Sequence, residues 1–144
     1  MSETIETRGE QMVTAGKVKI LIVDDNQLNL SALRAALNDM SVEIVSAKSG
    51  EEALKYLLAE DFALVLLDVQ MPGIDGFEIL TRIKADPKTS GVPVVMLSNL
   101  GQKEDIERAM SLGAKDFMAK KQKHSKAIRW ALLITSSSHS QKIF

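Results

Sequence analysis

Two apolar runs of this chain end on carboxylates. Residues 63–67 are all apolar and lead directly into Asp68, and a run that ends at Val23 leads into Asp24 and Asp25. A short apolar run of this kind is typical of a strand buried in a parallel sheet. A charge at the end of such a strand needs a compensating group, because burying an unpaired charge is costly.

Two more predicted strands end on polar side chains. The run 92–97 ends at Ser98, and the run 115–119 ends at Lys120. The carboxyl ends of parallel strands meet at one edge of the sheet, where open α/β sheets bind their ligands. We therefore expect three carboxylates, a hydroxyl and an ammonium to gather there. Any one of these residues is more often a turn former, a helix cap or a surface charge, but their coincidence at four strand ends favours a site.

This set of groups fits the transfer of a phosphoryl group to a carboxylate. Three neighbouring carboxylates repel one another, and a hard divalent cation such as Mg²⁺ relieves that repulsion and also binds phosphate oxygens. The lysine can pair with Asp68 or with a phosphoryl oxygen, and the serine hydroxyl can donate a hydrogen bond to that oxygen. Asp68 would be the nucleophile, while the cation and the lysine neutralise the charge that develops.

Strand patterns alternate with helical patterns along the whole chain. Strands are predicted over 17–23, 42–47, 63–67, 92–97 and 115–119, and helices over 27–40, from 50, over 77–85, over 103–112 and over 125–135. The alternation predicts parallel βαβ units with right-handed crossovers. The expected fold class is α/β, a doubly wound, flavodoxin-like sheet of five parallel strands. The order 2-1-3-4-5 is taken from known folds of this class.

Helical spacing also predicts which side chains face the sheet. In chain order these are Leu28, Leu30, Leu33, Ala36 and Leu37, then Ala53, Leu54, Leu57 and Leu58, then Phe77, Leu80 and Ile83, and finally Ile106, Ala109 and Met110. Gly113 is the predicted residue that ends the fourth helix.

The last predicted helix leaves little polar surface, since its apolar residues are Ala127, Ile128, Trp130, Ala131, Leu132, Leu133 and Ile134. A helix that is apolar all round must be buried on more than one side. We expect either that the tail 136–144 covers Trp130 and Leu133, or that a homodimer or another protein partner docks there. Sedimentation that shows only a monomer, with and without phosphorylation, would remove the homodimer.

Composition narrows the classes of function. The chain has 144 residues, a net charge of −1 and 4% aromatic residues. These values predict one domain over 17–135, with a flexible lead-in over 1–16 and a tail over 136–144, and they argue against binding of nucleic acid or an anionic membrane surface. The absence of cysteine excludes disulfides, thiolate metal sites and cysteine nucleophiles. No apolar run approaches the roughly 20 residues of a membrane span, and no signal peptide precedes the domain, so we expect a cytoplasmic protein.

Four motifs in order resemble the receiver domain of two-component response regulators. They are ILIVDD at 20–25, LLDVQMPGIDG at 66–76, VMLS at 95–98 and GAKDFMAK at 113–120. The resemblance covers residues 17–135. It implies a signalling protein that accepts a phosphoryl group from a phosphohistidine of a histidine kinase or histidine phosphotransfer protein, with slow self-dephosphorylation and no enzymatic turnover of its own.

The resemblance also implies roles for single residues. Asp68 would be the phosphoacceptor. Asp25 would be the main acidic Mg²⁺ ligand, Asp24 would help partly through water, and Gln70 would offer its backbone carbonyl to the metal.

Three further residues would act after the phosphoryl group arrives. Ser98 would follow it, Phe117 would rotate inward behind it, and Lys120 would pair with it. The output would come from a population shift on the face formed by the fourth helix, the fifth strand and the fifth helix.

Two positions depart from the family pattern at this edge. Lys121 stands where the family usually has a proline in a cis peptide, and a cis bond without proline costs about 2.5–4 kcal/mol. We assign the paired lysine to Lys120 because Phe117 keeps the family's spacing to it. Asn99 follows Ser98 where the family often has a small residue, and its bulk is expected to change the access of water and the rate of dephosphorylation.

Three other functions fit parts of the pattern. The chain could be the receiver module of a hybrid kinase or a phosphorelay, or a receiver-like binding module that is never phosphorylated. Haloacid-dehalogenase-like phosphatases also use an aspartyl nucleophile and Mg²⁺, but their mark is Asp-x-Asp after the first strand. Here Asp24 and Asp25 are adjacent, and Val69 and Gln70 follow Asp68.

Overall fold

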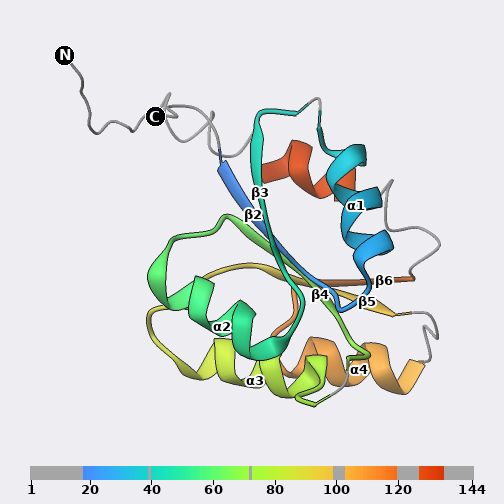
Figure 1. Cartoon of the computed structure of the whole chain (residues 1–144). Coiled ribbons are helices and arrows are strands. Elements are labelled where there is room, and N and C mark those ends of the chain that lie inside the picture. Colours follow the sequence, from blue (N-terminus) through green and yellow to red (C-terminus); the bar gives the residue numbers. More distant parts are fainter. Residues whose placement is uncertain (1–17, 39, 72, 99–102, 120–126, 135–144) are drawn as a thin grey trace.

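Five parallel strands run through the centre of the molecule (Figure 1). The computed structural model describes residues 18–38, 40–71, 73–98, 103–119 and 127–134. The strands are β2 (Val18–Val23), β3 (Val42–Ala47), β4 (Leu64–Asp68), β5 (Val94–Ser98) and β6 (Asp116–Ala119). They lie in the order β3-β2-β4-β5-β6, and every neighbouring pair is parallel. The predicted order 2-1-3-4-5 is confirmed.

Helices cover both faces of the sheet. They are α1 (Gln27–Ala36), α2 (Gly50–Ala59), α3 (Gly76–Ala85), α4 (Lys103–Ser111) and a helix over 127–134, which we call the last helix. Figure 1 shows α1 and the last helix on one face, with α2, α3 and α4 on the other. Two separate cores result, one on each face of the sheet. The predicted doubly wound α/β fold is therefore correct.

The middle of the sheet explains the continuous apolar runs. Every residue of β4 and of β5 is buried. A central strand of a parallel sheet has helices over both of its faces, so both sets of alternating side chains must be apolar. The edge strand β3 is mostly half-buried, which matches its mixed sequence.

Side-chain caps define where three helices begin. Asn26 accepts hydrogen bonds from the backbone N–H groups of the first turn of α1, Ser49 accepts one from Glu52 in α2, and Asp75 accepts one from Glu78 in α3. Capping satisfies N–H groups that have no partner within the helix. Gly113 has φ = 104° after α4, which confirms its predicted role at the end of that helix.

The set of helix residues predicted to face the sheet was too large. Leu28 is 79% exposed, Leu58 54%, Met110 47% and Ile106 37%, so these four predictions were wrong. A helix that lies on a sheet buries one stripe of side chains. Helical spacing identifies the side that faces the sheet, but residues at the margin of the stripe stay in solvent.

The last helix is only partly buried against the sheet. Ala127 and Ala131 are fully buried, Trp130 is half-buried, and Leu132 and Leu133 are more than half exposed. The expectation that apolar side chains of this helix reach the surface is thus correct for its leucines. The proposed cover, whether the tail over 136–144, a second copy or a partner, stays a prediction. The lead-in over 1–16 and that tail lie outside the described residues.

No helix in the described part of the chain combines the length and the apolar character that a membrane crossing would require.

Candidate functional site

The register of the strands brings the acidic residues to one edge. Val23 pairs with Leu67 in the β2–β4 ladder, so the residues that follow them, Asp24 and Asp68, lie level with each other. Asp68 in turn pairs with Leu97 on β5. Asp68 is thus the last residue of the central strand, with neighbours on both sides of it at the same edge.

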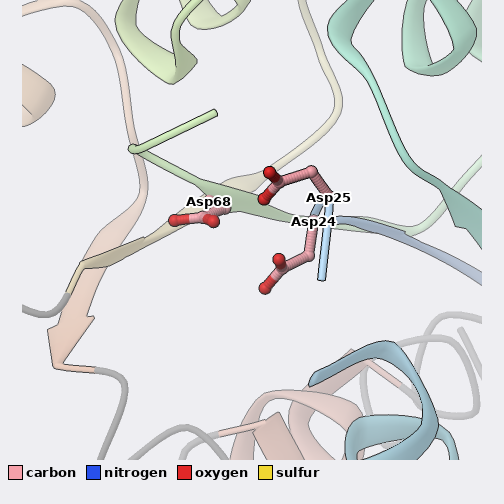
Figure 2. Close-up of side chains that lie close together, drawn as sticks. All are labelled: Asp24, Asp25 and Asp68. Atoms are coloured by element: carbon pink, nitrogen blue, oxygen red, sulfur yellow. The ribbon is translucent and has the colours of Figure 1, made fainter. Parts of the chain in front are cut away.

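The three predicted carboxylates meet there. One carboxylate oxygen from each of Asp24, Asp25 and Asp68 lies within 4.8 Å of the other two. Figure 2 shows the three side chains grouped beyond the ends of β2 and β4. The sequence prediction that these residues converge is confirmed.

Local hydrogen bonds hold two of the carboxylates in place. Asp24 is 1% exposed; its Oδ1 accepts from the backbone N–H of Asn26 at 2.9 Å, and its Oδ2 accepts from the side-chain amide of Asn29 at 3.1 Å. The Oδ1 atom of Asp68 accepts from the backbone N–H of Gln70 at 3.1 Å. Asp25 is exposed and so gives the cluster a side that solvent can reach.

This arrangement suits a hard divalent cation. Three carboxylates this close repel one another, and a cation with oxygen ligands removes that repulsion. Mg²⁺ uses few protein ligands and keeps several waters, which matches two buried carboxylates beside an exposed one. Asp24, Asp25 and Asp68 therefore fit an Mg²⁺ site, while a role for the backbone carbonyl of Gln70 as a further ligand stays a prediction.

Ser98 and Phe117 lie on β5 and β6, the next two strands of the sheet after β4. Ser98 is the last residue of β5 and is buried, one position beyond the partner of Asp68. Phe117 on β6 pairs with Met96 on β5 and is also buried. Ser98 thus lies at the same edge of the sheet as Asp68, and Phe117 lies on the following strand, paired with the residue two positions before Ser98.

Three predicted features fall outside the described residues: Lys120, Lys121 and Asn99. The position of the ammonium therefore stays a prediction. No cis peptide bond occurs among the described residues, and the Lys120–Lys121 bond is not among them.

The sequence analysis missed three residues that shape the site. Asn26 is the N-cap of α1. Asn29 lies in the first turn of α1, and its side-chain amide donates to Asp24. An asparagine directly before a helical pattern is a capping signal that could have identified Asn26.

The third missed residue is Gly76, the first residue of α3. A Cβ atom at Gly76 would lie 2.5 Å from the backbone oxygen of Asp68 and 2.7 Å from Cα of Val69. Its N–H also donates to the carbonyl of Val69 at 3.0 Å. Gly76 thus lets α3 begin directly against the backbone of Asp68 and Val69.

Comparison with known proteins agrees with the geometry. The sequence profile of the response regulator receiver domain matches residues 20–130. Response regulator PleD of Caulobacter vibrioides is 37% identical over 102 residues, which are 71% of this chain and 22% of PleD. Across several curated relatives, the chain spans between 14% and 42% of the relative's length.

Solved structures with the same fold include two that are more than a quarter identical. The receiver domain of a signal transduction histidine kinase from Syntrophus aciditrophicus has a TM-score of 0.74 and 28% identity, and the match covers 83% of this chain and 91% of that one. The phosphorylated cyanobacterial phytochrome response regulator RcpA has a TM-score of 0.70 and 29% identity, with 83% and 90% covered. The family profile spans most of the chain and includes all three clustered carboxylates, so this chain belongs to the response regulator receiver domain family.

Proposed function

We propose that this receiver accepts a phosphoryl group on Asp68 from a phosphohistidine of a histidine kinase or histidine phosphotransfer protein. A carboxylate oxygen of Asp68 attacks the phosphorus, the P–N bond breaks, and the imidazole of the donor leaves with the electron pair and takes up a proton. The observation that carries the proposal is the meeting of three carboxylates at the end of the central strand, with oxygens within 4.8 Å of one another.

Asp24, Asp25, Asp68 and the backbone carbonyl of Gln70 would hold Mg²⁺. When bound, Mg²⁺ neutralises the negative charge shared by the carboxylates and the incoming phosphoryl oxygens. The chain's own residues orient the reaction. The N–H of Gln70 donates to Oδ1 of Asp68 and so helps to orient the carboxylate for the attack.

Ser98 and Lys120 would receive the transferred group. The hydroxyl of Ser98 would donate to a phosphoryl oxygen, and the ammonium of Lys120 would pair with another. The product would be hydrolysed slowly by this chain itself, and we expect no catalytic turnover. Phe117 and the face that includes α4 would carry the change to a partner by a population shift.

Two solved relatives support this reading in different ways. RcpA was observed in a phosphorylated form, which makes phosphorylation of a chain with this fold and motif set a direct expectation. The relative from Syntrophus aciditrophicus is the receiver of a histidine kinase. That similarity favours, as a second candidate, a receiver module that works within a hybrid kinase or a phosphorelay.

Uptake of phosphate from a small donor tests the proposal. With acetyl phosphate and Mg²⁺, we expect intact-mass spectrometry to show at most one phosphoryl group per chain, and none when a chelator removes the Mg²⁺. Mass spectra without any adduct would favour a binding module that is never phosphorylated. Continued release of phosphate far beyond one equivalent, with rates typical of enzymes, would favour the phosphatase reading.

Leu28 marks the side from which we expect the phosphodonor to approach. It is 79% exposed, in the first turn of α1, three residues after the exposed carboxylate of Asp25. An exposed apolar side chain next to the acidic site could be covered by a donor protein that docks there, and this expectation can be tested by mutation.

A Leu28→Ala variant should separate docking from chemistry. We expect transfer from a donor kinase or phosphotransfer protein to slow by about tenfold, in line with an interface residue worth 1–2 kcal/mol. Uptake from acetyl phosphate, which needs no docking, should be unchanged. Leu58→Ala is the matched control, because Leu58 is 54% exposed on α2. Equal slowing in both variants would count against a docking role for Leu28.

A further inference from the structure

One carboxylate joins the last helix to the strand that carries Phe117. The indole N–H of Trp130 donates to Oδ2 of Asp116 at 3.0 Å. The backbone N–H of Phe117 donates to Oδ1 of the same carboxylate at 2.8 Å. The two oxygens of Asp116 therefore bind two different elements, the strand β6 through Phe117 and the last helix through Trp130.

The strand end of this link leads towards the proposed phosphorylation site. Phe117 is buried and pairs with Met96 on β5, two residues before Ser98. A shift of the Phe117 backbone moves a hydrogen bond to the carboxylate of Asp116. Hydrogen bonds to an ionised carboxylate are strong and directional. We therefore expect a movement of Phe117 to shift the carboxylate of Asp116.

The helix end of the link has room to move. Trp130 is half-buried and lines a groove of about 520 Å³, together with Leu133, Ile134, Lys84 and Lys115. Within the part of the chain that the structure describes, the indole is therefore not packed on all sides. A switch needs an element with two discrete arrangements, and an aromatic side chain beside open space can provide them.

The groove lies at the opposite edge of the sheet from the carboxylates. Its other lining residues include Ala63 and Pro93, which directly precede β4 and β5. A structural change that starts at Asp68 and alters this groove would therefore have to extend from one edge of the sheet to the other. Burial and, after it, the neighbouring Lys115 lower the pKa of Lys84 on the groove wall.

We propose that Asp116 couples Phe117 to Trp130, so that the phosphorylation state of Asp68 is read at the groove beside the last helix. This inference rests on the proposed function. Asp116 acts as a positioning residue, since it acts through its hydrogen bond to the backbone of Phe117. Coupling between two sites is reciprocal, so loss of the link must also change the affinity of the acidic site for a phosphoryl analogue.

Beryllofluoride with Mg²⁺, as a stand-in for the phosphoryl group, provides the test. ¹⁹F NMR reports its binding at Asp68, and Trp130, the one tryptophan of the chain, reports the groove by fluorescence. In the wild type we expect both signals to change together. In Asp116→Asn the beryllofluoride should still bind, but the fluorescence response should be lost, because an amide oxygen accepts from one N–H while its nitrogen faces the other donor.

A second variant measures the reverse direction. Trp130→Phe keeps an aromatic ring and removes the N–H. We expect Trp130→Phe and Asp116→Asn to shift the beryllofluoride affinity in the same direction, by about fivefold or more. The double variant should show no further shift, since both changes break one link.

Arg34→Ala is the matched control. Arg34 joins α1 to the other edge strand, through hydrogen bonds to the carbonyl of Ile44 and the hydroxyl of Ser46. Its loss removes a comparable contact between a helix and an edge strand, and it should leave the beryllofluoride affinity and the fluorescence response as in the wild type.

The outcomes distinguish the two levels of the proposal. If beryllofluoride binds the wild type but the Trp130 response persists in Asp116→Asn, or if the affinities of all variants are equal, the coupling is overturned and the proposed function stands. If ¹⁹F NMR shows no binding to the wild type, the proposed function fails and the coupling falls with it.

Discussion

An Asp68→Asn variant should take up no phosphoryl group from acetyl phosphate under conditions in which the wild type takes up one per chain. The amide keeps the shape of the side chain, and its oxygen can still accept the N–H of Gln70 that holds Asp68. It lacks the nucleophilic carboxylate oxygen. We expect labelling to fall by more than about a thousandfold, as is usual when an enzyme-like site loses its nucleophile.

We expect the same variant to lose labelling but to gain stability. Asp68 is fully buried and shares its edge of the sheet with two other carboxylates within 4.8 Å. Removal of one negative charge should raise the free energy of unfolding in metal-free buffer, by an amount on the order of 1 kcal/mol. Added Mg²⁺ should stabilise the wild type and have little effect on the variant, because fewer charged ligands remain.

Asp25→Asn serves as the control for these measurements. It removes a negative charge from the same cluster and leaves the proposed nucleophile intact. Its labelling should be reduced and should recover as the Mg²⁺ concentration is raised, which Asp68→Asn cannot do. An adduct that persists on Asp68→Asn would mean that another residue accepts the phosphoryl group.

A Gly76→Ala variant should lose about 3 kcal/mol of the free energy of unfolding. The added Cβ atom would lie 2.5 Å from the backbone oxygen of Asp68 and 2.7 Å from Cα of Val69. Both contacts are with backbone, which cannot turn aside as a side chain can. Either α3 must move away from the end of β4, or the residue after the strand must shift, and both changes displace the proposed nucleophile.

Urea denaturation measures this effect, with Gly91→Ala as the matched control. A Cβ atom at Gly91 would meet nothing within 4 Å, and its backbone is not in the left-handed region. Gly91→Ala should therefore be neutral or slightly stabilising, since alanine restricts the unfolded chain. Similar stabilities of the two variants would show that the structure relaxes around Gly76 at little cost.

Local patterns in the sequence were enough to place the acidic site. The run Leu64–Leu67 is apolar on both sides of a strand and then stops at Asp68, and a strand buried between two layers of helices requires that pattern. The same reasoning located Ser98 at the end of β5. Because parallel strands bring their carboxyl ends to one edge, the meeting of Asp24, Asp25 and Asp68 followed from topology before any distance was known.

Local patterns were less able to determine how much of each helix is buried. Leu28, Leu58, Ile106 and Met110 have the spacing of core residues and are exposed. Burial depends on how much of the helix surface the sheet covers, and the covered width is set by the neighbouring helices. A single helix sequence carries no information about its neighbours.

The sequence by itself thus determined the α/β fold, the strand ends and the meeting of the three carboxylates, because each depends on polarity and periodicity within a few residues. Only the tertiary structure decided that Gly76 must lack a side chain, and that Asp116 holds Trp130 and the backbone of Phe117 together. These features arise where different elements meet, α3 with the end of β4 and the last helix with β6. Their distances depend on strand register and helix packing, which involve the whole fold at once.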